Sequence, residues 1–177
     1  MAKKNERTLK LLNTALTMEK KGISFYEEAH STCGNDVGKE IYKMLKDDEA
    51  VHIERITEIY SSLEAGNDWV SEWKSLKLVH GDLNEFFIEL AKEHSVDFSV
   101  DSSDIDALNV GIDFELKSVK FYTEHLEGAE DPMEREFLKY MVKEEKSHYK
   151  LLDDMKFYLN DPASWFVEKE RSGFDGA

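Results

Sequence analysis

The decapeptide DDEAVHIERI at residues 47–56 interrupts the apolar pattern of the helix that we expect to contain it. Apolar residues recur three and four positions apart on either side of its centre, as at Leu45 and Ile56. This spacing is typical of the buried stripe of a helix. Glu49 and His52 occupy positions that the stripe assigns to the core. Buried polar groups of this kind need partners, because an unpaired charge in an apolar interior costs several kcal/mol.

The same arrangement occurs a second time, 96 residues further along the chain. The segment MEKKGISFYEEA (18–29) aligns with FELKSVKFYTEH (114–125), and this alignment places Glu19 on Glu115. The same offset, without a gap, gives two further pairs: Glu49 with Glu145, and His52 with His148. One Glu-x-x-His pair is common on charged helices, and its usual explanation is a solvent-facing pair. Two pairs in core positions, in a register fixed by a separate segment, indicate an internal repeat.

Each copy of the repeat predicts two helices joined by a turn. The midpoint between Glu19 and Glu49 falls in STCGND, and the midpoint between the second pair of glutamates falls in EGAEDP. Both segments are rich in the Gly, Asn and Asp that favour turns. Residues equidistant from a turn lie at the same height of an antiparallel pair. Each hairpin should therefore bring one Glu and one Glu-x-x-His pair to a common level.

The remaining segments predict how the hairpins are connected. Residues 64–103 form a connector that is long enough to cross the length of a bundle, so the second and third helices should run parallel. We expect a short helix at 82–94 within it. The segment DPME (131–134) predicts the start of the fourth helix, with Asp131 as N-cap and Glu134 closing a capping box. The overall prediction is an all-α, single-domain chain (1–177) built as a four-helix bundle of two hairpins.

A short C-terminal helix should begin at DPASWFVEKE (161–170), with Trp165 and Phe166 docked on the bundle or on a second subunit. The connector carries four aromatic residues that could form a partner-binding or dimer surface: Trp69, Trp73, Phe86 and Phe87.

Charge and composition exclude several classes of function. The 177 residues carry a net charge of −15, which argues against nucleic acid or an anionic membrane as partner and favours cations. The single Cys33 cannot form an intramolecular disulfide or a cysteine-rich metal site. No uncharged run approaches the ~20 residues of a membrane helix, so we expect a soluble, cytoplasmic protein.

The six repeated polar residues point to metal. Four carboxylates in one apolar interior repel each other, and no Lys or Arg lies on the four predicted stripes near their level. Two divalent ions would balance the four charges, with the imidazoles as neutral ligands. Carboxylates with one imidazole per metal suit iron or manganese better than zinc, although zinc can substitute in a crystal. The predicted metal ligands are Glu19, Glu49, His52, Glu115, Glu145 and His148.

Further residues are candidates for supporting these ligands. Tyr26 and Tyr122 lie seven positions beyond the first and third glutamates and could hydrogen-bond the ligating carboxylates; ordinary core tyrosines are the alternative. Asp48 and Glu144 each precede a ligand and could orient the histidine of the opposite hairpin; exposed charges are the alternative. The other histidines have no partner at metal-ligand spacing: His30, His80, His94 and His125.

The segments MEKKGISFYEEA, DDEAVHIERI, FELKSVKFYTEH and KEEKSHYKLL (143–152) resemble the diiron domain of the rubrerythrin family, within the ferritin-like superfamily. The resemblance implies a ferritin-like bundle with a left-handed crossover between its halves. It also implies two bound iron ions, a cytoplasmic location and assembly as a homodimer or a higher homo-oligomer.

The chain differs from typical members of this family at two points. They carry a second carboxylate one turn after the third-helix glutamate, where this chain has Ser118; the equivalent position of the first helix is Gly22. They also carry a rubredoxin domain with paired CxxC motifs, which a single cysteine excludes within this chain. The resemblance therefore implies the plain ligand set of four Glu and two His, re-reduced by an external electron donor such as a rubredoxin-type protein.

Three functions remain open from the sequence. The first is a diiron oxidoreductase that reduces hydrogen peroxide or O2 by two electrons, with the six ligands acting through the metals and the two tyrosines supporting them. The second is a ferroxidase that handles iron for storage or detoxification. The third is a non-catalytic, metal-stabilised bundle that binds a partner.

Overall fold

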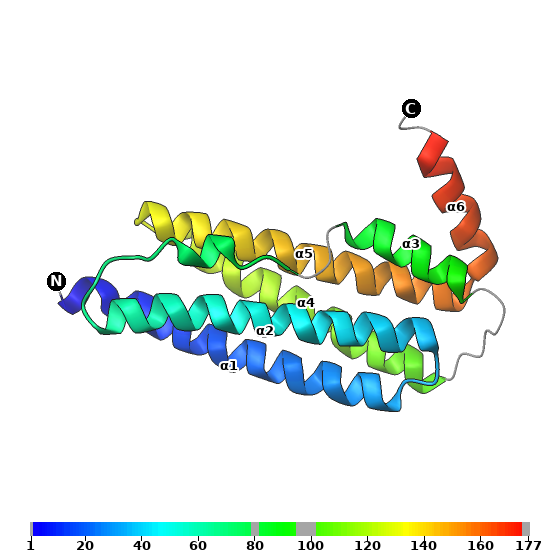
Figure 1. The fold of residues 1–177 in the computed structure, drawn as a ribbon, viewed down its shortest axis with the longest axis horizontal. Coiled ribbons are helices and arrows are strands. Elements are labelled where there is room, and N and C mark those ends of the chain that lie inside the picture. Colours follow the sequence, from blue (N-terminus) through cyan, green and yellow to red (C-terminus); the bar gives the residue numbers. More distant parts are fainter. Residues whose placement is uncertain (1, 79–81, 95–101, 175–177) are drawn as a thin grey trace.

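Four long helices in two antiparallel hairpins form the bundle of this protein (Figure 1). The computed structural model describes residues 2–78, 82–94 and 102–174. Its helices are α1 (Ala2–Thr32), α2 (Asp36–Glu64), the 3-10 turn η1 (Glu72–Ser75), α3 (Leu83–Glu93), α4 (Ser102–Glu127), α5 (Pro132–Asn160) and α6 (Pro162–Phe174). No strand occurs among the described residues. The predicted all-α fold is confirmed.

Both hairpin turns lie where the midpoints of the repeat place them. Asn35 caps α2, since its side chain accepts a hydrogen bond from the Gly38 amide at 3.0 Å. Asp131 caps α5 by accepting from the amides of Met133 and Glu134. The predicted capping box is wrong in one respect. The Glu134 carboxylate accepts hydrogen bonds from the Arg7 guanidinium at 2.7 Å instead of closing the box, and this contact joins the start of α5 to α1.

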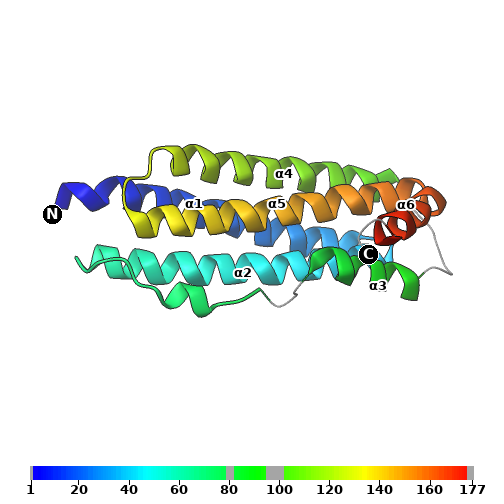
Figure 2. The same ribbon diagram turned by 90° about the horizontal axis from the view of Figure 1, so that it is seen from above.

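The connector runs along the bundle from the end of α2 to the start of α4 (Figures 1 and 2). The chain leaves α2 through Gly66, whose φ of 82° lies in the left-handed region that glycine adopts without steric cost. The connector contains η1 and the predicted short helix, which is α3. The helices α2 and α4 run parallel along the bundle, as predicted (Figure 1).

The predicted surface of connector aromatics is wrong for two of its four members. Trp73 packs edge-to-face on Phe137 and is 1% exposed. Phe87 is fully buried against Tyr158 and Trp165. Both rings belong to the core of the same chain, because the connector lies on the bundle and buries its apolar side there.

The C-terminal helix α6 docks on the bundle through Trp165, as predicted. This indole is fully buried between Phe87 of α3 and Tyr158 of α5. Its Nε1 donates a hydrogen bond to Asp154 Oδ1 at 3.0 Å. The helices α3, α5 and α6 are therefore joined by one aromatic cluster.

The core consists of two hydrophobic clusters separated by a polar layer. One cluster lies toward the α1–α2 turn and includes Tyr26, Leu45, Leu152 and Met155. The other lies toward the α4–α5 turn and includes Leu12, Ile56, Trp73, Tyr122, Phe137 and Met141. The repeated glutamates and histidines lie between these clusters, so the polar layer is closed at both ends by apolar side chains.

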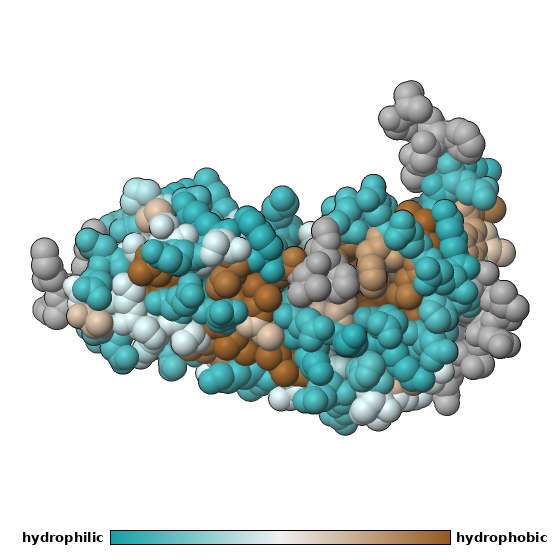
Figure 3. Space-filling model, in the orientation of Figure 1, coloured by the Kyte–Doolittle hydropathy of each residue, from teal (hydrophilic) through white to brown (hydrophobic). Residues whose placement is uncertain are grey.

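Hydrophilic residues cover most of the surface in the view of Figure 3, and apolar residues show in the middle of the molecule and around α3. Three large apolar side chains are exposed among the described residues: Val110, Leu116 and Val167. Within the same part of the chain, no helix is long and apolar enough to cross a membrane.

Candidate metal centre

The six predicted ligands meet in one buried cluster at the centre of the bundle. Each of the four long helices contributes to it, α1 and α4 with one glutamate and α2 and α5 with a Glu-x-x-His pair. All six side chains are 0% exposed: Glu19, Glu49, His52, Glu115, Glu145 and His148. The helical spacing explains the convergence, because residues three apart share a face of a helix and the hairpins bring both faces to one level.

The donor atoms form two groups that share two glutamates. One group consists of Glu19, Glu49, His52 and Glu145, and the other of Glu49, Glu115, Glu145 and His148; in each, the donor atoms lie within 4.8 Å of one another. The Nδ1 atom of His52 lies 3.1 Å from Glu49 Oε2 and 3.2 Å from Glu145 Oε1. The Nδ1 atom of His148 lies 3.9 Å and 4.0 Å from the other oxygens of the same carboxylates.

This division assigns different positions to the four glutamates. Glu49 and Glu145 each present one oxygen to the His52 group and the other oxygen to the His148 group, which is the arrangement of a bridging carboxylate. Glu19 lies only in the His52 group, with Oε2 at 3.7 Å from the ring nitrogen, and Glu115 lies only in the His148 group, at 3.8 Å. The sequence could not distinguish these positions, because the repeat makes Glu19 and Glu115 equivalent to each other but does not say which pair is shared.

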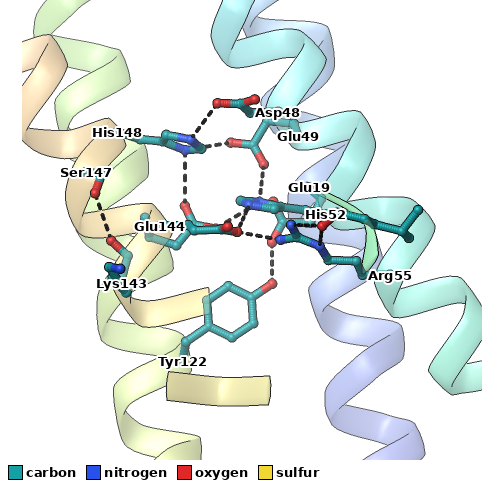
Figure 4. Close-up of polar contacts among 12 residues, drawn as sticks. Glu19, Asp48, Glu49, His52, Arg55, Tyr122, Lys143, Glu144, Ser147 and His148 are labelled. Atoms are coloured by element: carbon teal, nitrogen blue, oxygen red, sulfur yellow. Dashed lines mark hydrogen bonds and ion pairs between the residues drawn. The ribbon is translucent and has the colours of Figure 1, made fainter. Parts of the chain in front are cut away.

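Both imidazoles are held by carboxylates on their outer side (Figure 4). The Nε2 atom of His52 lies 3.0 Å from Glu144 Oε2 of the opposite hairpin. The Nε2 atom of His148 lies 3.3 Å from Asp48 Oδ2. The predicted contacts of Asp48 and Glu144 are confirmed. A carboxylate that accepts the Nε2 proton fixes the tautomer in which Nδ1 carries a lone pair toward the cluster.

The two tyrosines reach across the bundle to the two unshared glutamates. The Tyr26 hydroxyl of α1 donates to Glu115 of α4, and the Tyr122 hydroxyl of α4 donates to Glu19 of α1. Both rings are fully buried. The predicted hydrogen bonds to the candidate ligands are confirmed, and each tyrosine turns one oxygen of its glutamate away from the centre.

Most of the donor atoms that face the centre lack hydrogen-bond partners. Buried polar atoms are satisfied in about 90% of cases, yet most of the unpartnered buried side-chain oxygens among the described residues belong to the cluster. They are Glu19 Oε2, Glu49 Oε1, Glu115 Oε2 and both oxygens of Glu145, together with His148 Nδ1. Hard carboxylate oxygens and imidazole nitrogens that converge in this way are a suitable donor set for two divalent ions of the iron or manganese type.

Electrostatics support this interpretation with one exception. Burial, followed by the charges of Glu19 and Glu145, raises the pKa of Glu49 well above its usual value. Burial and the charge of Glu145 likewise raise the pKa of Glu115, and burial and the charge of Glu19 raise the pKa of Glu145. These shifts express the repulsion expected among crowded carboxylates.

Glu19 is the exception to the expected rise. Burial would raise its pKa, but hydrogen bonds with Glu49, His52 and Tyr122 and the charge of His52 outweigh burial and lower the pKa to about 2. Burial would lower the pKa of His52, but hydrogen bonds with its surrounding carboxylates, Glu144 first, raise it well above the usual value.

The predicted stripes contain no Lys or Arg near the site, but Arg55, which lies beside the stripe of α2, is fully buried one turn beyond His52. Its Nη1 donates to Glu144 Oε2 at 2.5 Å, and its Nε and Nη2 donate to the carbonyl of Leu76 in the connector. Arg55 does not neutralise the candidate ligands directly. The sequence pattern did not indicate Arg55, because the corresponding residue of the repeat is Leu151. The carbonyl that Arg55 bonds also lies in the connector, which is not repeated.

The buried face of α4 includes small residues. Gly111 and Ser118 are buried, whereas Ile112 and Val119 are only partly buried. The Ser118 hydroxyl is fully buried and has no hydrogen-bond partner. At Gly22, an added Cβ would lie 3.0 Å from the Phe114 ring and 3.5 Å from Glu49 Cδ, so the helices approach closely beside the shared carboxylate. Neither position adds a carboxylate to the centre.

The other described histidines have ordinary roles. His30 Nδ1 bonds the Lys39 carbonyl and His125 Nδ1 bonds the Phe121 carbonyl, while His94 is the C-cap residue of α3. His80 lies outside the described residues.

The fold and the cluster together define a class of protein: a helical bundle with a buried carboxylate and imidazole site that can hold two metal ions. A model of the rubrerythrin family matches residues 10–156 of the chain, which include most of each of the four long helices and all six candidate ligands. The chain belongs to the rubrerythrin family. Comparison with curated proteins and with solved structures gives no match.

Proposed function

We propose that this protein is a non-haem diiron oxidoreductase that reduces hydrogen peroxide or O2 by two electrons as its Fe(II) is oxidised. The observation that carries the proposal is the set of unpartnered donor atoms, which divide into two groups sharing Glu49 and Glu145. Glu49 and Glu145 would help to hold both ions. Glu19 and His52 would complete the donors of one ion, and Glu115 and His148 those of the other. Manganese is the alternative metal for the same donors.

Bound iron would supply the electrons for the reaction, and the protein would supply a fixed and enclosed surrounding. Tyr26 and Tyr122 hold the unshared glutamates by hydrogen bonds. Burial and the nearby glutamate charges raise the pKa of both phenols well above their usual value. Both tyrosines therefore keep their protons and remain donors at neutral pH. The apolar clusters on either side exclude bulk water from the site.

Glu144 connects the enclosed site with solvent. Its side chain bonds His52 and also lines a groove of about 880 Å³ between α5, α3, α6 and the connector residues Lys77 and Leu78. The residue as a whole is 8% exposed. Reduction of peroxide to water consumes two protons as well as two electrons. We infer that protons and reducing equivalents approach from this groove, with the reducing equivalents coming from a separate donor protein.

The test is to load the protein with Fe(II) without oxygen and to add hydrogen peroxide or air while recording the absorbance. We expect a rapid change that consumes one peroxide for each pair of Fe(II) ions. Glu145→Gln should abolish the change, because it removes the charge and one of the two donor oxygens of a carboxylate that belongs to both groups. Glu136→Gln, an exposed glutamate of the same helix that pairs with Lys74, is the matched control and should behave like the parent.

The same experiment separates the competing functions. Repeated turnover with peroxide and an added reductant supports the oxidoreductase. Continued oxidation of Fe(II) supplied far beyond two ions per chain, together with assembly into a large cage, supports iron handling instead. A Glu145→Gln variant that reacts as fast as the parent would contradict the assignment of the site. Size determination in solution tests the proposed homodimer or higher homo-oligomer.

A further inference from the structure

The two halves of the candidate metal centre have equivalent ligands but different outer surroundings. On the His52 side, a single oxygen of Glu144 accepts hydrogen bonds from His52 Nε2 at 3.0 Å and from Arg55 Nη1 at 2.5 Å. The carboxylate that supports this imidazole is therefore paired with a permanent positive charge (Figure 4).

Arg55 is fixed in this position by three kinds of contact. Besides Glu144, its guanidinium bonds the carbonyl of Leu76 and lies 4.9 Å from the centre of the Tyr140 ring. Its side chain is 0% exposed, and it is the one fully buried lysine or arginine among residues 6–78, 82–94 and 102–171. A guanidinium held from several sides cannot turn away from Glu144.

The His148 side has no equivalent cation. Asp48 Oδ2 lies 3.3 Å from His148 Nε2, while Asp48 Oδ1 is buried without a hydrogen-bond partner. The position of the repeat that corresponds to Arg55 is Leu151, an apolar residue. Among the described residues, the supporting carboxylate on this side therefore has no basic side chain beside it other than His148.

We propose that Arg55 makes the two metal positions unequal, so that a divalent ion binds first and more tightly beside Glu115 and His148 than beside Glu19 and His52. This inference rests on the proposed two-metal site. A carboxylate that accepts the imidazole proton makes the ring a stronger ligand. The charge of Glu144 is partly neutralised by Arg55, so Glu144 should strengthen the His52 ring as a ligand less than Asp48 strengthens the His148 ring. The uncompensated charge of Asp48 also attracts a cation directly.

Changes to such outer carboxylates typically alter metal affinity 10–100-fold. We therefore expect the two positions to differ about tenfold or more in affinity. The consequence is an ordered loading of the centre, in which the position remote from Arg55 fills first.

The test uses cobalt alone. Metal-free protein receives one Co(II) per chain, and anomalous scattering from its crystals gives the occupancy of each position. In the parent, the position beside His148 should hold nearly all of the metal. Asp48→Asn keeps the shape and the acceptor oxygen but removes the charge, so the occupancies should become nearly equal. Arg55→Met exposes the charge of Glu144 and should also equalise them.

The double variant Asp48→Asn/Arg55→Met provides the decisive comparison. It leaves a charged support only on the His52 side, so the order of filling should reverse. Asp47→Asn is the matched control, since it removes one charge from the same helix without touching an imidazole partner, and it should retain the parental order. If Arg55→Met does not fold, Asp48→Asn against Asp47→Asn still tests the proposal.

Equal occupancy in the parent, or a preference for the His148 position that survives in Asp48→Asn, would overturn the inference and leave the two-metal site intact. Absence of cobalt from both positions would overturn the proposed function as well. Parental preference, equalised occupancies in each single variant and reversal in the double variant would establish the role of Arg55.

Discussion

The orientation of each imidazole is the decisive feature at the residue scale. In both His52 and His148, Nε2 meets an outer carboxylate and Nδ1 faces the cluster. The carboxylates of Glu144 and Asp48 come from the opposite hairpin in each case. The two hairpins thus fix each other's candidate ligands, which an isolated Glu-x-x-His helix could not do.

This geometry predicts different results for two histidines of the second hairpin. His148→Ala removes one of the two nitrogen donors, so the protein should bind about one iron instead of two, with affinity at the altered position reduced at least 10–100-fold. His125→Ala should still bind two, because the His125 ring bonds the Phe121 carbonyl and contacts the Phe121 ring on the outer side of α4. Metal analysis after anaerobic loading measures both. Two irons in His148→Ala would contradict the assignment.

The sequence predicted the candidate ligands and their supporting tyrosines and carboxylates, because each of them recurs in the repeat and occupies a helical register. It did not predict Arg55, whose partners are a connector carbonyl and a side chain of the other hairpin. The repulsion expected among the four carboxylates also does not hold equally for all of them, because Glu19 has a lowered pKa. That difference depends on the contacts of Glu19 with Glu49, His52 and Tyr122, a property of the assembled site rather than of any one segment.

At the scale of the elements, the docking of α6 centres on one large, fully buried residue. Trp165 is fully buried between α3 and α5, and its indole N–H is bonded to Asp154. Trp165→Ala would leave a cavity and an unused acceptor, so it should lower the free energy of unfolding by about 3–5 kcal/mol. Val167 lies on the same helix but is 49% exposed.

Denaturant unfolding followed by circular dichroism measures this effect, with Val167→Ala as the matched control. The control should change the free energy of unfolding by less than about 0.5 kcal/mol. Equal stabilities of the two variants would show that α6 does not contribute to the stability of the bundle.

Helix starts and turns were more predictable than the course of the connector. Asn35, Asp131 and Pro132 act locally, through hydrogen bonds and backbone angles that need no knowledge of the tertiary structure. The place of Trp73 depends on Phe137 and Tyr140, more than sixty residues away. Without a helical period in its surroundings, an exposed and a buried tryptophan look alike in the sequence.

At the scale of the whole molecule, the crowded charges make stability depend on pH. The pKa values of Glu49, Glu115 and Glu145 are raised in the folded protein. Their stabilising contribution is complete below the usual value of 4.5 and is lost as the pH rises through the folded pKa values. The raised pKa of His52 has the same effect, because its stabilising contribution is lost as the pH rises above the usual value of 6.5. The lowered pKa of Glu19 has the opposite effect on stability. Its stabilising contribution is present above 4.5 and is lost as the pH falls from 4.5 toward about 2.

Between roughly pH 5 and pH 8, the metal-free protein should therefore melt at a lower temperature as the pH rises. Metal binding requires deprotonated carboxylates, so its stabilising effect should grow over the same range. Thermal melts of both forms across this range should show a widening gap between their melting temperatures. A constant or narrowing gap would mean that the glutamates do not titrate with the metal.

The central claim is that the six buried side chains hold two metal ions. The most direct measurement is an anomalous difference map at the iron absorption edge from crystals loaded with Fe(II) without oxygen. We expect two peaks within the bundle, both beside Glu49 and Glu145, one also beside Glu19 and His52 and the other also beside Glu115 and His148. A single peak in the cluster, no peak there, or iron bound only to surface carboxylates would contradict the claim.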